Sequence, residues 1–119
     1  RAAWREARSG LDGFGDADDA ARHQLRRRLK RLRDGLDAVA PAWPAKPVRR
    51  YARALSAAVE ALGRLSDVAA AQAQCVPRMA SEPAAAFAAG WLAAEQLHAV
   101  AAAARALADL RATPRPWQG

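Results

Sequence analysis

The segment HQLRRRLKRLRDGLD, residues 23–37, limits the possible folds more than any other part of the chain. Leucines recur through it at spacings of three and four residues, and on a helical wheel they occupy roughly one quarter of the circumference. Cations fill most of the remaining positions. The segment therefore predicts an amphipathic helix that packs on a core and carries positive charge beside its buried stripe. The residues expected to face the core are Leu25, Leu29, Leu32, Leu36 and Val39.

Prolines and glycines divide the rest of the chain into further helices. Asp16 is a plausible N-cap for the leucine-containing helix, and the segment PAWPAKP, with three prolines in seven residues, ends it. Gly63 is expected to stop the next helix, and Ser66 or Asp67 to cap the one after. The four expected helices cover about residues 18–39, 48–62, 67–75 and 84–112.

The expected fold class is all-α, because no segment of useful length alternates apolar and polar residues as a strand would. We expect an antiparallel four-helix bundle over residues 16–112. A basic lead-in helix and turn precede it over residues 1–15. A proline-containing tail follows over residues 113–119, either disordered or laid as a strap over the bundle. Many small side chains in the last helix permit close helix approach, and Phe87 and Trp91 are expected in the core.

The cations of the first helix gather along one of its edges. They fall within a sector of about 80° beside the leucines, over a length of about 15 Å at 1.5 Å per residue. Asp34 and Asp37 come after this sector, so like charges repel one another within it. The sector holds His23, Arg26, Lys30 and Arg33, with Arg22 and Arg27 at its edges, and these six residues are called the basic ridge below.

Such a ridge favours a polyanionic partner, in keeping with the formal net charge of +7. Arginine offers phosphate oxygens a planar fork of donors and lysine offers a point charge. An ordinary solvated helix face is the alternative, although such faces usually mix charges of both signs. Two other functions stay open. One is binding to a nucleic-acid backbone, although the ridge lacks aromatic stacking residues. The other is contact with an acidic protein.

Catalytic and metal chemistry find little support in the sequence. The acidic residues are scattered over expected caps and outer faces, so we expect no enzyme activity and no cofactor. His23, His98 and Cys75 show none of the spacings of zinc ligands. Cys75 is the single cysteine, which favours a reducing compartment, here the cytoplasm. No apolar run approaches the ~18 residues of a membrane span, so a membrane partner is not expected.

Four stretches of the chain together resemble the CHAD family, the conserved-histidine α-helical domain. The basic ridge resembles the H-x-x-R-x-x-x-K-x-x-R signature of that family. LGRLSD, residues 62–67, looks like its L-G-x-x-N-D turn, with Ser66 in place of the usual Asn. AAGWLAA, residues 88–94, looks like its small-G-W segment, and WREARSGLDGFGD, residues 4–16, is similar to its basic lead-in.

The resemblance implies two similar four-helix bundles related by a pseudo-twofold axis, which bind inorganic polyphosphate along a basic channel lined by both halves. This chain resembles the second half, and it begins with Arg1 rather than Met. The missing N-terminal half or a second copy is therefore an expected partner. An adjacent CYTH domain and association with polyphosphate granules in the cytoplasm are further expectations of the same kind.

The resemblance also assigns roles to individual side chains. It makes four residues of the basic ridge direct ligands of phosphate, His23, Arg26, Lys30 and Arg33, and it places Arg22 and Arg27 beside them. Arg5 and Arg8, on the lead-in helix, are expected to face the same polymer, with Trp4 packing beneath them. A further cluster lies on the outer face of the second expected helix and is either a secondary phosphate patch or a solvated surface. That cluster consists of Arg49, Arg50 and Arg53.

Overall fold

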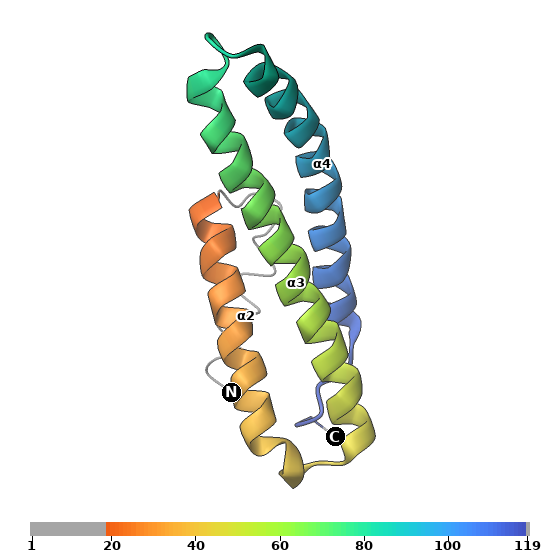
Figure 1. Ribbon diagram of the computed structural model, residues 1–119. Coiled ribbons are helices and arrows are strands. Elements are labelled where there is room, and N and C mark those ends of the chain that lie inside the picture. Colours follow the sequence, from red (N-terminus) through yellow and green to blue (C-terminus); the bar gives the residue numbers. More distant parts are fainter. Residues whose placement is uncertain (1–18, 119) are drawn as a thin grey trace.

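The computed structural model describes residues 19–118, and these residues fold into a bundle of three long helices (Figure 1). No strand occurs among them, which confirms the all-α class. The described part measures 58 × 22 × 22 Å. The helices are α2 (Asp19–Val39), α3 (Ala45–Cys75) and α4 (Pro83–Ala112), with short 3-10 turns η2 (Ala40–Ala42) and η3 (Val76–Arg78) between them.

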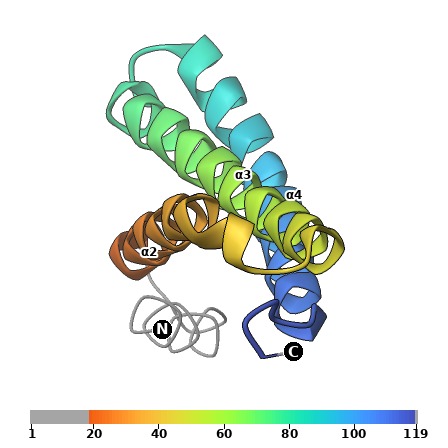
Figure 2. The ribbon, with the colours of Figure 1, turned by 90° about the horizontal axis from the view of Figure 1, so that it is seen from below.

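Helix α3 is the central element of the bundle. It contacts α2 from its N-terminal end to beyond Gly63 and α4 along its length, whereas α2 and α4 make few direct contacts (Figure 2). The chain runs down α2, up α3 and down α4, so neighbouring helices are antiparallel (Figure 1). The lead-in helix and the Asp16 cap lie outside the described residues. Any site on α2 is thus held in place by α3.

The expected second and third helices are in fact one helix, so the division at Gly63 is wrong. Gly63, Ser66 and Asp67 all lie inside α3, and none of them stops or caps a helix. No glycine among the described residues has a positive φ, the conformation that a glycine helix stop needs. The buried apolar positions continue past Gly63 to Leu65, and this packing carries the helix through. The described chain therefore builds three helices rather than four.

The proline-rich connection does separate α2 from α3, as expected, but α3 begins earlier than the sequence suggested. Pro44 is its N-cap residue, and Pro47 lies within its first turn. A proline is tolerated there because the first amide groups of a helix have no partner inside the helix.

The core forms between the leucine stripe of α2 and both other helices. Leu29 and Leu55 are completely buried, and the four leucines expected to face inward all do so. Val39 is 45% exposed, so its expected burial is wrong, because α2 ends at that residue. The core residues of α3 and α4 are Val48, Tyr51, Leu55, Ala58, Val59, Leu62, Leu65, Ala99, Ala103, Leu107 and Leu110.

Helix α4 turns its small residues inward and its aromatic residues outward. Ala85, Ala89, Ala99 and Ala103 are buried. Phe87 and Trp91, expected in the core, are exposed, and that expectation is wrong. The stretch is apolar on all sides, so the wheel could not tell its inner from its outer face.

The tail lies as a strap over the lower end of the bundle, one of the two alternatives foreseen. The ring of Trp117 meets Tyr51 edge-on at a centroid distance of 5.3 Å and meets Trp43 at 6.3 Å. Thr113, at the end of α4, donates its hydroxyl proton to the carbonyl oxygen of Asp109 at 2.7 Å. The strap therefore ties the α2–α3 connection to the end of α4.

Candidate polyanion-binding site on α2

The basic ridge lies along the edge of α2 that borders α3. The buried leucines fix the rotation of α2, and its rotation fixes the direction in which each cation leaves the helix. His23 and Arg27 are exposed, whereas the side chains nearer to the seam are half-buried. The half-buried members are Arg22, Arg26, Lys30 and Arg33.

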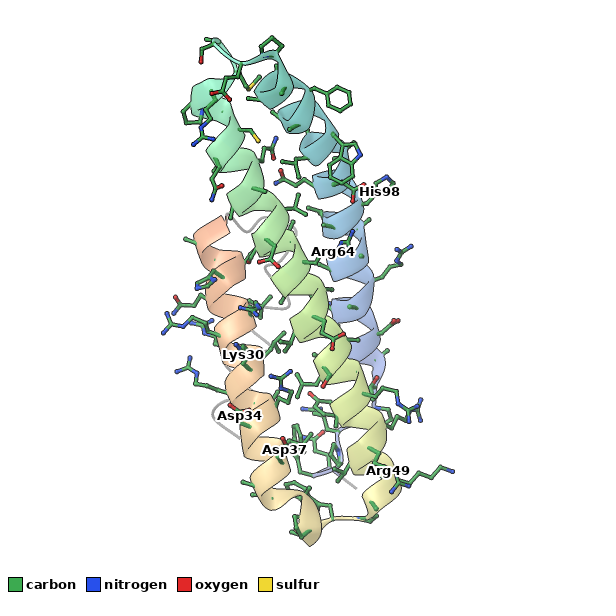
Figure 3. The ribbon with its side chains drawn as sticks, in the orientation of Figure 1. Lys30, Asp34, Asp37, Arg49, Arg64 and His98 are labelled. Carbon is green, nitrogen blue, oxygen red and sulfur yellow. The ribbon has the colours of Figure 1, made fainter. Side chains whose placement is uncertain are left out.

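Three cations along this edge have no acidic side chain beside them in the described part of the chain. Within residues 19–118, no carboxylate lies within ion-pair distance of Arg26, Lys30 or Arg33. Asp34 and Asp37 are exposed and lie further down α2 (Figure 3). Each pair of like charges one helical turn apart lowers the stability of the helix by a few tenths of a kcal/mol. The repulsion between these charges opposes folding, so this edge of α2 is a candidate surface for binding an anion.

An ion pair is present elsewhere in the described bundle, between α3 and α4. Arg64 Nη2 lies 3.4 Å from Glu95 Oε2, and the Arg64 side chain is largely exposed. Figure 3 shows Arg64 on the side of α3 that faces α4, away from the ridge. Glu95 of α4 thus pairs with Arg64 of α3 and not with an arginine of the ridge.

Arg26 lies across the backbone of α3 at Gly63. An ideal Cβ built on Gly63 would lie 3.2 Å from Nε and 3.3 Å from Nη2 of Arg26. The Nε atom is buried and has no hydrogen-bond partner among the described residues. The sequence had suggested a helix stop at Gly63, and it gave no sign that this glycine contacts the ridge.

A shallow pocket adjoins the N-terminal end of the ridge. Its volume is about 280 Å³, and it brings Arg22 and His23 of α2 together with Ser66 of α3. Ser66 had been expected to cap a helix, and the structure places its hydroxyl group beside the ridge instead. The other residues that line the pocket are Leu65, Ala69, Ala70 and Ala73.

The other basic residues named from the sequence are not joined to the ridge by any described contact. Arg49, Arg50 and Arg53 are exposed near the start of α3, and Arg49 points away from α2 (Figure 3). Arg5 and Arg8 lie outside the described residues. The described structure thus places the ridge along one edge of α2 and the three arginines on an exposed surface of α3, where either role is open to them.

Neither a metal cluster nor a membrane span appears in the described part of the chain. No three His, Cys, Asp or Glu side chains there come close enough to hold a metal ion. None of the described helices combines the length and the apolar character that a membrane crossing requires.

Comparison with known families bears on these features directly. A family model described as the CHAD domain matches residues 1–76, which is more than half of the 119-residue chain. The chain belongs to the CHAD family. The match takes in the whole basic ridge and α3, and it ends at the first residue of η3. It does not reach the AAGWLAA stretch of α4. Searches of curated proteins and of solved structures returned no match.

Proposed function

We propose that this CHAD chain binds inorganic polyphosphate through the basic ridge and does not turn it over. The observation that carries the proposal is a row of cations on one edge of α2, backed by buried leucines, of which Arg26, Lys30 and Arg33 have no acidic partner among the described residues. Membership of the CHAD family supports the same ligand.

The geometry suits a flexible polyanion. Because Arg26, Lys30 and Arg33 are half-buried, their stems are already ordered, and binding costs less conformational entropy than it would for fully exposed chains. Successive cations along α2 are spaced so that one polymer can meet several of them at once. Arginine pairs bidentately with phosphate oxygens, and lysine adds a point charge.

Polyphosphate fits this surface better than nucleic acid does. Between Arg22 and Arg33 the ridge contains no Phe, Tyr or Trp side chain on which a base could stack. A ligand made of phosphates alone needs charge and hydrogen-bond donors, and the ridge supplies both. Nucleic-acid backbone binding and contact with an acidic protein remain the alternatives that an experiment must separate.

A competition assay tests the ligand. Labelled long-chain polyphosphate is bound to the full chain, and duplex DNA, single-stranded RNA or short phosphates are added at matched phosphate concentration and at two salt concentrations. We expect unlabelled polyphosphate to compete best at both. Stronger competition by duplex DNA would overturn the proposal. Phosphate release from the bound polymer by pure protein would overturn its non-catalytic part.

We infer that the outward face of α4 binds a second CHAD-type bundle, here a second copy of the chain. Phe87 is 79% exposed and Trp91 59%, although each is a large apolar residue. Phe87 and Trp91 lie one helical turn apart, so they form one patch. Exposed apolar patches of this kind usually mark contact surfaces, and two copies could share the patch across a twofold axis.

Sedimentation equilibrium tests this inference. We expect the chain to dimerise, Trp91→Glu to shift the mass toward the monomer, and Val39→Glu, which places the same charge on an exposed residue of α2, to leave the dimer intact. A monomer at high micromolar concentration would rule out the second copy.

Pairing with an N-terminal CHAD half, an adjacent CYTH domain and a cytoplasmic location at polyphosphate granules remain predictions.

A further inference from the structure

Gly63 occupies a position where glycine brings no benefit to the helix that contains it. It lies in the interior of α3, with helical backbone on both sides. Glycine is less favourable than alanine there, because it loses more conformational freedom on folding. No turn or positive φ requires it. The reason for a glycine at this position must therefore lie in what contacts it.

That contact is the guanidinium group of Arg26. A Cβ on Gly63 would lie 3.2 Å from Nε, 3.3 Å from Nη2 and 3.6 Å from Cζ of Arg26. Gly35 in α2 and Gly90 in α4, the other two helical glycines of the described chain, would place their Cβ atoms in open space. Of these three glycines, only Gly63 makes room for a charged group of the ridge.

The contact restricts Arg26 from one side. Its Nε atom is buried against α3 without a hydrogen bond among the described residues, whereas the two Nη atoms are not buried in this way. The Nε–Nη2 edge of the guanidinium group thus lies against the backbone of α3 at Gly63. A methyl group added at position 63 would require the guanidinium group to shift by a few tenths of an ångström.

We propose that Gly63 is a positioning residue for phosphate binding, because its missing side chain leaves room for the Nε–Nη2 edge of the Arg26 guanidinium group against α3, on the same edge of α2 that carries Lys30 and Arg33. This inference rests on the proposed function and adds to it a residue that never touches the ligand.

Gly63→Ala separates a positioning role from a role in folding, because we expect it to lower the affinity for polyphosphate without lowering the stability of the fold. Alanine favours the helix, so we expect the melting temperature to be equal to or above that of the wild type. Polyphosphate affinity should fall by roughly three- to tenfold, which is within the range of coupling energies between residues in direct contact. Gly35→Ala is the matched control. It makes the same change in open space on α2 and should leave the affinity unchanged.

A double-mutant cycle and a spectroscopic measurement complete the test. In an Arg26→Ala background, Gly63→Ala should have no further effect on affinity. By NMR, exchange of the Arg26 Nε proton with solvent should be slow in the wild type, faster in Gly63→Ala and unchanged in Gly35→Ala.

Unchanged affinity in Gly63→Ala, or an equal loss in the Arg26→Ala background, would overturn the inference while leaving polyphosphate binding itself intact. Absence of binding by the wild-type chain would instead overturn the proposed function, and the positioning role with it.

Discussion

The salt dependence of polyphosphate affinity should reveal how many cations of the protein contact the polymer. Of the ridge residues, Arg26, Arg27, Lys30 and Arg33 carry a permanent charge and have no acidic partner among the described residues. For flexible single-stranded polyanions, each neutralised phosphate contributes about 0.7 to the slope of log affinity against log salt. Four contacts then give a slope of about −2.8, so affinity falls about fiftyfold between 50 and 200 mM salt.

Replacing Lys30 and Arg33 with glutamine removes two of the four contacts and should halve that slope to about −1.4. The affinity of this variant should therefore fall only about sevenfold over the same range of salt. Glutamine keeps most of the stem that covers apolar surface, so the melting temperature should change little. Fluorescence anisotropy of labelled polyphosphate at four salt concentrations measures both slopes.

The matched control replaces Arg49 and Arg53 with glutamine. This variant loses the same net charge, but both residues are exposed on α3, and Arg49 points away from the ridge (Figure 3). Its slope should stay near that of the wild type. Equal slopes for the two variants would show that overall charge drives binding and that the ridge is not a site.

Three further predictions concern the fold. Leu29→Ala should lower the free energy of unfolding by about 2 to 5 kcal/mol in urea titrations, because this leucine is completely buried. Trp117→Ala should cost roughly 1 to 3 kcal/mol by the same assay, because it removes two aromatic pairs, with Trp43 and Tyr51. Arg64→Gln should cost less than about 1 kcal/mol, since its ion pair with α4 is solvent-exposed, and a larger loss would contradict this account of that pair.

The sequence predicted α2 closely, because leucines at helical spacing specify both the helix and its buried face. Four of the five residues assigned to the core from this pattern are buried, and Val39 fails only because the helix ends there. The ridge follows from the same wheel, since the orientation of the stripe also fixes the orientation of the cations beside it. What the pattern could not give is the partner helix against which the ridge lies.

The error at Gly63 has a definite physical origin. Glycine commonly ends helices by adopting a positive φ, so Gly63 predicts a helix end. The apolar residues at helical spacing, which continue through Leu62 to Leu65, predict instead that the helix goes on. That spacing was the available signal for a single long helix. The contact with Arg26 was beyond reach, because it depends on how two helices pack.

The outward aromatic residues of α4 show a different limit. Where nearly every position is alanine or another apolar residue, periodicity carries no information about which face is buried. The choice was made by helix packing, which placed Ala99 and Ala103 against the rest of the core. Phe87 and Trp91 were left outside, and no rule based on hydrophobicity alone would have placed them there.

The most direct test of the account is to map the polymer on the protein. A chain of 12.7 kDa is well suited to NMR, and polyphosphate can be titrated while the backbone amide and arginine side-chain signals are followed. We predict that the shifts concentrate along the ridge on α2 and at Gly63 and Ser66 of α3. Shifts centred on Arg49, Arg50 and Arg53, or spread evenly over all the basic residues, would contradict it.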